Sequence, residues 1–295
     1  MVEVLAIVTC HNRKNLSLAF LRSLASQINL GEINLTTFLV DDGSTDGTSE
    51  AVKENFPKVK VFMGDGNLYW AGAVRKALLE LKNQPKQFQG ILIVNDDLEL
   101  AENAVSQLVQ TSLQFNAIVG STVLSRGGEV EATGGRRGRM CKPRLRKVLA
   151  NGEVQPCEFL PGHLMYIPMH HFIKLGGFSD KLRYGLIDLD FTFRASKESI
   201  PVLLTATPLA VTNHYHNNFK DISSLRGSWR SLLRKVWFHP KGPYWKDSIN
   251  YLRLVSPYLW WFWLVFYYRA MFKAMLVSSL GIFKSIKQSN SFWYL

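Results

Sequence analysis

Apolar residues follow two spacings along the first 125 positions, one typical of strands and one typical of helices. Short apolar runs rich in β-branched residues predict strands, and apolar residues repeating every three to four positions predict helices. Because these segments alternate, the pattern favours an α/β fold with a mostly parallel sheet flanked by helices. The expected strands cover residues 3–10, 35–42, 59–64, 90–97 and 117–124. The expected helices cover residues 15–27, 48–56, 70–82 and 101–114.

Polar residues follow three of these expected strands directly. Thr9–Arg13 follows the first strand, Asp41–Asp42 ends the second, and Asn95–Asp97 ends the fourth. Ligands bind beyond the carboxyl ends of the strands in sheets of this kind. We therefore expect one binding site at that edge of the sheet.

The composition is that of a globular protein. The chain has 295 residues, of which 47% are hydrophobic and 20% are charged, enough for one large domain or one domain with an appendage. Its three cysteines form no CxxC pair, which argues against a zinc ribbon or a disulfide scaffold and suits a reducing compartment. The apolar run 4–9 is too short for a signal peptide.

The formal net charge of +12 is unevenly distributed. Residues 121–150 carry a net charge of +6 and residues 221–295 carry +9, so the remainder is slightly acidic. Basic regions of this kind either bind phosphate-bearing partners or are solvated surface. The chain has no nucleic-acid-binding motif, so we do not expect a nucleic-acid partner.

Two common phosphate-binding motifs are absent. The first expected strand is followed by "TCHNRKN", which has none of the glycines of a dinucleotide-binding GxGxxG turn. The sequence also contains no GxxxxGK[ST] loop. Both classes are therefore disfavoured.

Four segments, in this order, resemble the landmarks of family 2 glycosyltransferases: "IVTCHNRKN", "LVDDGSTDGT", "VNDDLEL" and "LIDLDFTFRA". The resemblance covers roughly residues 3–220, and "VDDGSTDGT" is its most specific part. It implies the GT-A fold, a Rossmann-like α/β architecture. It also implies inverting transfer of a sugar from a nucleoside diphosphate, usually with a divalent metal.

The resemblance assigns roles to the acids at the sheet edge. Asp97 would bind Mg²⁺ or Mn²⁺, which take oxygen ligands, and Asp96 would lie near the ribose. Asp42 would accept a hydrogen bond from the base, which suits uracil or thymine. Helix capping is the alternative for Asp97, and turn chemistry is the alternative for the residues that follow Asp42. The other residues expected to line the nucleotide pocket are Thr9, His11 and Arg13.

Residues 64–78 match the family less regularly. Asn67 fits, but Tyr69 stands where the family usually has glycine and Arg75 where it usually has asparagine. Arg75 could reach a phosphate. Tyr69 and Trp70 could stack on a sugar or base, or could belong to the core. These departures leave the donor sugar open.

The second half is expected to supply catalysis. Asp188 would be the general base that takes the proton of the acceptor hydroxyl, with a helix cap as the alternative. Many relatives have Glu where this chain has Ile187, and rhamnosyltransferase-like members more often show Ile-Asp. Asp190 is expected to cap the helix or to pair structurally, with Arg194, four residues later, as its candidate partner.

A histidine after the last strand-like run often completes the metal or diphosphate site in this family. His214 is the first candidate and His216 the second, against the alternative of a structural or solvated histidine.

The last 75 residues differ from the rest of the chain. The segment 256–283 is crowded with Trp and Tyr, and its longest apolar run without a charge, residues 258–268, has eleven residues. That is short of the ~20 that span a bilayer, so we expect helices lying at an anionic membrane surface. The alternatives are a partner-binding or dimer-forming helix and a short true span. The Arg-rich segment 126–152 is either a lid near the acceptor or a basic surface hairpin.

These observations lead to one hypothesis. Residues 1–220 form a metal-dependent hexosyltransferase domain, and residues 221–295 form a membrane-associated helical region. The expected donor is dTDP-rhamnose or a UDP-sugar, and the expected acceptor is a glycan, lipid-linked in surface polysaccharide assembly. The expected location is cytoplasmic, on the inner face of the plasma membrane. The alternatives are a catalytically silent sugar- or lipid-binding relative and a nucleotidyltransferase.

Overall fold

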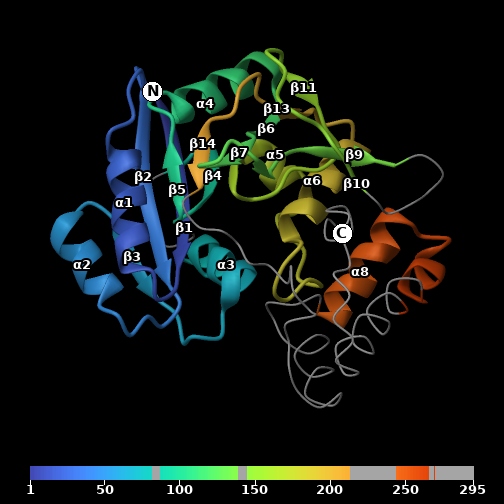
Figure 1. Cartoon of the computed structure of the whole chain (residues 1–295), viewed down its shortest axis with the longest axis horizontal. Helices are drawn as coiled ribbons and strands as arrows, with labels where there is room; N and C mark the ends of the chain where they lie inside the picture. The colour runs from blue at the N-terminus through green and yellow to red at the C-terminus, as the bar shows by residue number, and fades with distance from the viewer. Residues whose placement is uncertain (82–86, 139–144, 213–243, 266–268, 270–295) are drawn as a thin grey trace. The chain divides into compact units, whose positions relative to one another are not determined.

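The computed structural model describes residues 1–81, 87–138, 145–212, 244–265 and 269. Its central sheet has eight strands in the order β11-β13-β6-β12-β4-β1-β2-β3 (Figure 1). Four neighbouring pairs are parallel, namely β1 with β2, β1 with β4, β2 with β3, and β6 with β13. The strand bounds are Val2–Cys10 (β1), Ile33–Asp41 (β2), Lys60–Met63 (β3), Gly90–Asn95 (β4), Ile118–Gly120 (β6), Gln155–Pro156 (β11), Leu164–Pro168 (β12) and Val202–Leu204 (β13).

The sheet is mixed because β12 runs antiparallel to both of its neighbours, β4 and β6, and β11 runs antiparallel to β13. A second sheet has the strand order β5-β14-β7-β8, and β9 pairs with β10. These strands are Leu98–Leu100 (β5), Val123–Ser125 (β7), Val130–Ala132 (β8), Gly135–Arg137 (β9), Leu145–Lys147 (β10) and Ala210–Thr212 (β14).

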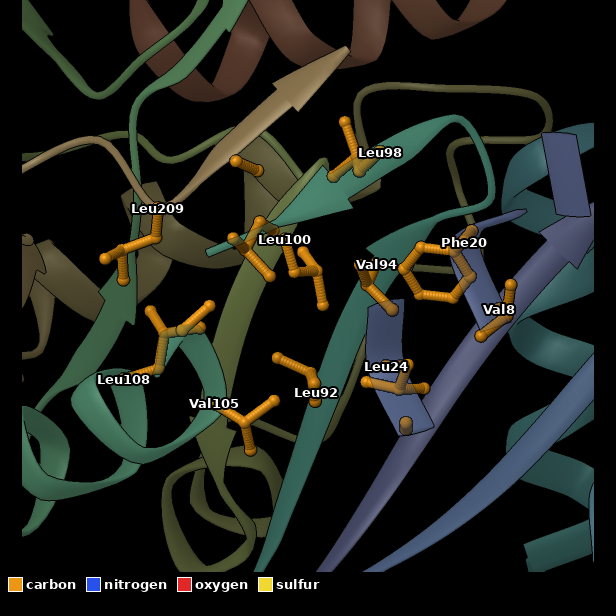
Figure 2. Close-up of a cluster of buried hydrophobic side chains, with 14 of the residues drawn as sticks. Val8, Phe20, Leu24, Leu92, Val94, Leu98, Leu100, Val105, Leu108 and Leu209 are labelled. Carbon is orange, nitrogen blue, oxygen red and sulfur yellow. The ribbon is translucent and has the colours of Figure 1, made fainter. Parts of the chain in front are cut away.

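Helices cover both faces of the central sheet. Val4, Ala6 and Val8 of β1 pack in one cluster with residues of α1 and α4, part of which is shown in Figure 2. Leu5 and Ile7 alternate with them and point to the opposite face, where α3 packs against β1 and β2. The helices are Lys14–Ala25 (α1), Thr48–Asn55 (α2), Tyr69–Leu81 (α3), Ala104–Phe115 (α4), Met169–Lys174 (α5), Ile187–Lys197 (α6) and Trp245–Val255 (α8).

The α/β architecture expected from the sequence is confirmed, with two local differences. The apolar run 117–124 is two strands in different sheets, β6 and β7, rather than one. The run that begins at residue 90 ends as a strand at Asn95, because Asp96 and Asp97 form a turn into β5.

The chain separates into two compact units. The first comprises the described residues within 1–136, 147–179 and 187–215, and it contains the central sheet. The second comprises the described residues within 137–146, 180–186 and 216–295, including α8. The expected boundary at residue 220 stays a prediction. In the part of the chain that the structure describes, no helix is long and apolar enough to cross a membrane.

Candidate active site

The carboxyl ends of β1, β2 and β4 meet at one edge of the central sheet. Cys10 is paired with Asp41, and Thr9 is paired with Asn95. The segments that leave these three strands therefore begin side by side, as the sequence predicts. They carry the acids and the basic residues that were expected to bind the nucleotide.

Arg13 connects two buried carboxylates at this edge. Its Nη1 donates to Oδ1 of Asp96 at 3.1 Å and to Oδ2 of Asp97 at 3.2 Å. The side chains of Asp96 and Asp97 are only 2% and 0% exposed, whereas that of Arg13 is 31% exposed. Ser17, four residues after Arg13, donates from Oγ to Oδ2 of Asp96 at 2.8 Å. Buried acids of this kind are stable only when paired and hydrogen-bonded, which these contacts accomplish.

Burial changes the electrostatics of this cluster. It raises the pKa of Asp96 to about 6, while the Arg13 guanidinium and the Ser17 hydroxyl oppose that rise. The carboxylate oxygens of the cluster are donors that a hard divalent cation prefers.

The approach of β14 to Asp97 bears on the expected metal ligands. Thr212, the last residue of β14, donates from Oγ1 to the carbonyl oxygen of Asp97 at 3.2 Å. His214 and His216 lie outside the described residues. Among the residues that the structure describes, no group of three or more His, Cys, Asp or Glu side chains is arranged to hold a metal ion.

Asp42 organises the loop that leads into α3. Its Oδ1 accepts from the backbone N–H groups of Gly66 at 2.9 Å and Leu68 at 3.2 Å, and its Oδ2 accepts from Tyr69 at 2.8 Å. Its carbonyl oxygen lies 2.6 Å from Nδ1 of His11, so the Nδ1–H tautomer donates there. The expected contact between Asp42 and the nucleobase stays a prediction, and the structure adds a second role for the same carboxylate.

Asp41, the preceding acid, acts within its own turn. Its Oδ1 accepts from the backbone N–H of Ser44 at 2.8 Å, and its Oδ2 accepts from the hydroxyl of Ser49. Its side chain is fully buried. The two adjacent acids thus stabilise different segments. Asp41 binds the turn that follows it, and Asp42 binds a loop more than twenty residues later in the chain.

Tyr69 has a left-handed backbone, with φ of 53°. Such a conformation favours glycine, the residue that the family resemblance led us to expect at this position. Trp70 follows at the start of α3, and its indole packs against Gly162. A Cβ placed on Gly162 would lie 2.5 Å from Cζ2 of Trp70 and 3.3 Å from Cβ of Asp188. The indole, the glycine and the aspartate are therefore neighbours.

Asp188 lies in the first turn of α6, and its Oδ2 accepts from the N–H of Gly162 at 2.6 Å. His163, the residue after Gly162, accepts at its carbonyl oxygen from the N–H of Asn95 at 3.0 Å. Because Asn95 immediately precedes Asp96, these contacts place Asp188 at the same edge of the sheet as the Arg13 cluster. Burial raises the pKa of Asp188, which makes its carboxylate a stronger base once ionised.

Three other predicted site residues show no comparable arrangement. Asn67 is exposed, and its N–H donates to Oδ1 of Asp65 at 2.9 Å. Arg75 donates from Nη2 to the carbonyl oxygen of Ser179 at 2.7 Å, which ties α3 to the chain beyond α5. Thr9 is half-buried near the end of β1. Their contacts with a nucleotide stay predictions.

The pairing expected between Asp190 and Arg194 is confirmed by a contact of 2.9 Å between Oδ2 and Nε.

Two site residues were missed by the sequence reading, and only one of them had a sequence signal. Ser17 follows Arg13, the N-cap residue of α1, at a spacing of four, and this local spacing could have identified it. Gly162 gave no signal, because its contacts with Trp70 and Asp188 join segments far apart in the sequence.

Comparison with known proteins places this geometry in context. The family model described as "Glycosyl transferase family 2" matches residues 5–163. An N-acetylglucosaminyl-diphospho-decaprenol L-rhamnosyltransferase of Mycobacterium tuberculosis (strain CDC 1551 / Oshkosh) is 21% identical over 230 residues. These cover 69% of this chain and 74% of the relative.

Solved structures of glycosyltransferases share the fold. Mannosyltransferase PcManGT from Pyrobaculum calidifontis, in complex with GDP-Man and Mn²⁺, matches with a TM-score of 0.56 and 16% identity. The match covers 93% of this chain and 73% of that one. S. aureus TarS 1-349, in complex with UDP, matches with a TM-score of 0.55 and 15% identity, covering 86% of this chain and 64% of that one.

Proposed function

The chain belongs to glycosyl transferase family 2 and has the GT-A fold, and from this premise we propose that it is an inverting hexosyltransferase that uses a nucleoside-diphosphate sugar. The observation that carries the proposal is the Arg13–Asp96–Asp97 cluster, with Asp188 at the same sheet edge. An isolated buried acid has many structural explanations. Two buried acids around one half-exposed arginine, beside a third acid with a raised pKa, form a site that suits phosphates and proton transfer.

In the proposed reaction, Asp188 is the general base. The acceptor hydroxyl attacks the anomeric carbon from the face opposite the leaving group, and its proton passes to the Asp188 carboxylate as the new C–O bond forms. The old bond breaks with its electron pair moving to the nucleoside diphosphate. The Gly162 N–H holds the carboxylate in one orientation through Oδ2.

The donor would be held by the other residues of the edge. Arg13 is the half-exposed cation nearest to the acids and would contact the diphosphate. We propose Asp97 and His214 as metal ligands, with Asp96 near the ribose. The carbonyl oxygen of Asp97 is bonded to Thr212, only two residues before His214, so the chain is short enough to bring that imidazole to Asp97. A bound Mg²⁺ or Mn²⁺ would neutralise charge on the departing diphosphate.

The acceptor is proposed to be a lipid-linked glycan. The M. tuberculosis relative is named for an acceptor on a decaprenol diphosphate and for L-rhamnose as the sugar. The Ile187-Asp188 pair in this chain agrees with a rhamnosyltransferase that uses dTDP-rhamnose, and a UDP-sugar is the second choice.

Exposed apolar side chains after α8 support docking at the cytoplasmic face of a membrane. Tyr258 is 89% exposed, Trp261 is 56% exposed, and Phe262 and Val265 are also exposed. Trp and Tyr favour the membrane interface, and the net positive charge of 221–295 favours anionic lipid. Co-sedimentation with anionic vesicles should fall in Trp261→Ser. Leu113→Ser, at an equally exposed apolar position on α4, is the matched control. Equal binding by both variants would refute the docking role.

The test of the function is ligand-dependent stabilisation. Thermal unfolding should be measured with UDP, dTDP and GDP, with their sugars, and with Mn²⁺, Mg²⁺ or chelator. A metal-dependent rise in Tm for one nucleotide, lost in Asp97→Ala, is expected. Glu99→Ala removes an exposed acid two residues away and is the matched control. No rise with any nucleotide would contradict the glycosyltransferase proposal and favour a binding module without turnover.

A further inference from the structure

Asn12 lies between His11 and Arg13, two residues that were expected to line the nucleotide pocket, and no role for it followed from the sequence. Its backbone has φ of 51°, in the left-handed region. Few residues other than glycine adopt this conformation, and asparagine does so more readily than most. Asparagine is therefore one of the few residues that suit the backbone at position 12.

Asn12 joins the loop that follows β1 to the loop that follows β2. Its Oδ1 accepts from the backbone N–H of Thr45 at 2.8 Å and from the Thr45 hydroxyl at 3.3 Å. Its own backbone N–H donates to Oγ of Ser44 at 2.8 Å. The side chain and the backbone of one residue thus bind two consecutive residues that are more than thirty positions later in the sequence.

The imidazole of His11 fits the same network in one tautomer. The carbonyl oxygen of Asp42 can only accept, so Nδ1 of His11, 2.6 Å away, carries the hydrogen. In the neutral ring Nε2 is then an acceptor, and Nδ2 of Asn12 lies 3.2 Å from it. Because Oδ1 of Asn12 has to face the Thr45 N–H, Nδ2 is the amide atom left to donate to His11. The assignments of the two side chains therefore agree with each other.

One more hydrogen bond completes the connection, from the backbone N–H of Lys14 to Oδ2 of Asp46 at 3.0 Å. We call residues 11–14 and 42–46, with the bonds between them, the loop clasp. The clasp extends to a third loop, because the Asp42 carboxylate accepts three backbone N–H groups from the segment that leads into α3. The segments that leave β1, β2 and β3 are thus linked to one another by hydrogen bonds.

Local turn chemistry does not account for Asn12. An asparagine in a turn usually hydrogen-bonds the backbone two residues later within the same turn. The described partners of its Oδ1 and of its backbone N–H belong instead to the loop after β2. Asn12 is also exposed, so water could satisfy the same polar groups. The specific effect of these bonds is to define how the two loops lie relative to each other.

We propose that Asn12 is a positioning residue for nucleotide binding. It holds the loop after β1 against the loop after β2, and it fixes the backbone from which the side chains of His11 and Arg13 extend. His11 thereby stays beside Asp42, and Arg13 stays beside the two buried acids that follow β4. This inference rests on the proposed function, because it assumes that a nucleotide binds at this edge of the sheet.

The test uses the full-length protein with three single variants and one double mutant. Asn12→Gly keeps a residue that suits the left-handed backbone and removes the side-chain bonds. Ser44→Ala removes, from the opposite loop, the acceptor of the Asn12 N–H. Asn29→Gly is the matched control, because Asn29 is also exposed and left-handed, with φ of 56°, but lies between α1 and the amino end of β2. The Kd values of UDP, dTDP and GDP with Mn²⁺ are measured by calorimetry, together with Tm, donor KM and kcat.

Asn12→Gly should raise the Kd of the nucleotide that binds the wild type most tightly by about tenfold, equivalent to ~1.4 kcal/mol, because binding then has to order the two loops. Donor KM should rise in proportion, whereas kcat at saturating donor should stay within about twofold, since the proposed base lies on α6. Ser44→Ala should act in the same direction but less. The double mutant should lose less affinity than the sum of the single variants, because both substitutions open the same clasp.

The Tm of Asn12→Gly should fall no further than that of Asn29→Gly, whose nucleotide affinity should equal that of the wild type. Wild-type affinity in Asn12→Gly would overturn the inference, and Ser44→Ala decides the question if Asn12→Gly fails to fold. Equal losses of affinity in Asn12→Gly and Asn29→Gly would show a general effect on stability, and losses that simply add in the double mutant would show that no shared clasp exists. Wild-type protein that binds none of the three nucleotides would refute the proposed function itself, and with it the role of Asn12.

Discussion

Replacing Gly162 with alanine should damage both stability and catalysis, because the new methyl group has no room. It would lie 2.5 Å from Cζ2 and 2.7 Å from Cη2 of Trp70. Non-bonded carbons are optimally 3.5–4.0 Å apart, so the contact is about 1 Å too short. The neighbour is a rigid indole at a helix start, so the ring or the Gly162 backbone has to move by about that amount.

The expected magnitudes follow from this displacement. Overpacking of this kind costs about 1–3 kcal/mol, and each kcal/mol lowers Tm by roughly 2–4 °C in chains approaching this size. The Gly162 N–H also donates to Asp188 at 2.6 Å, so its movement releases the proposed base. A shift of ~1 Å there should lower kcat by about 10²-fold while nucleotide affinity is retained.

The assay compares kcat, nucleotide-dependent thermal shift and Tm in Gly162→Ala, in two further single variants and in one double mutant. Gly127→Ala is the matched control, because its nearest neighbour, Oγ of Ser125, would lie 3.7 Å away in ordinary contact. Trp70→Ala removes the clash, so Gly162→Ala should be less harmful in that background, with a coupling of about 0.5–3 kcal/mol. A Gly162→Ala variant that matches Gly127→Ala in kcat and Tm, or a double mutant whose stability losses simply add, would refute the reasoning.

Three further changes have defined outcomes. Because burial raises the pKa of Asp188, kcat should already fall on acidification at a pH above the ordinary aspartate range. Asp188→Asn should bind nucleotide but show a very low, pH-independent rate. If kcat of that variant still fell at acidic pH as in the wild type, Asp188 would be excluded as the base. Gly90→Ala places a Cβ 2.1 Å from Oη of Tyr166, so Tm should fall by several degrees while kcat of the folded protein is unchanged. At Tyr69, glycine should be more stable than alanine by about 1 kcal/mol in urea unfolding, since a Cβ makes the left-handed backbone less favourable. The reverse order would contradict the strain.

The sequence predicted the alternation of strands and helices along the chain and the shared edge of the sheet, because both depend on local patterns. Apolar runs mark β1, β2 and β4, and the rule that parallel strands present their carboxyl ends together then places Arg13, Asp42 and Asp96 at one edge. The position of β12 between β4 and β6, and the separation of β6 from β7, could not be predicted. They depend on pairings between segments 40 to 90 residues apart, which leave no trace in a local window.

The roles of individual acids were predictable only where their partners are nearby in the sequence. The pair Asp190 and Arg194 lies on one helix at a spacing of four, and it was correctly expected. Asp42 was expected from the family resemblance to contact a base, and nothing in its local sequence indicated three N–H groups between residues 66 and 69.

The departure from the family at Tyr69 can now be interpreted physically. The backbone at this position keeps the left-handed conformation that glycine favours, with φ of 53°, and the Asp42 carboxylate holds it there by accepting the Tyr69 N–H at 2.8 Å. Tyr69 thus carries an aromatic ring on a backbone that glycine would adopt without strain. Trp70, the next residue, packs against Gly162 beside Asp188. The indole of Trp70 is therefore next to the proposed base, where we expect it to influence selectivity for the transferred sugar.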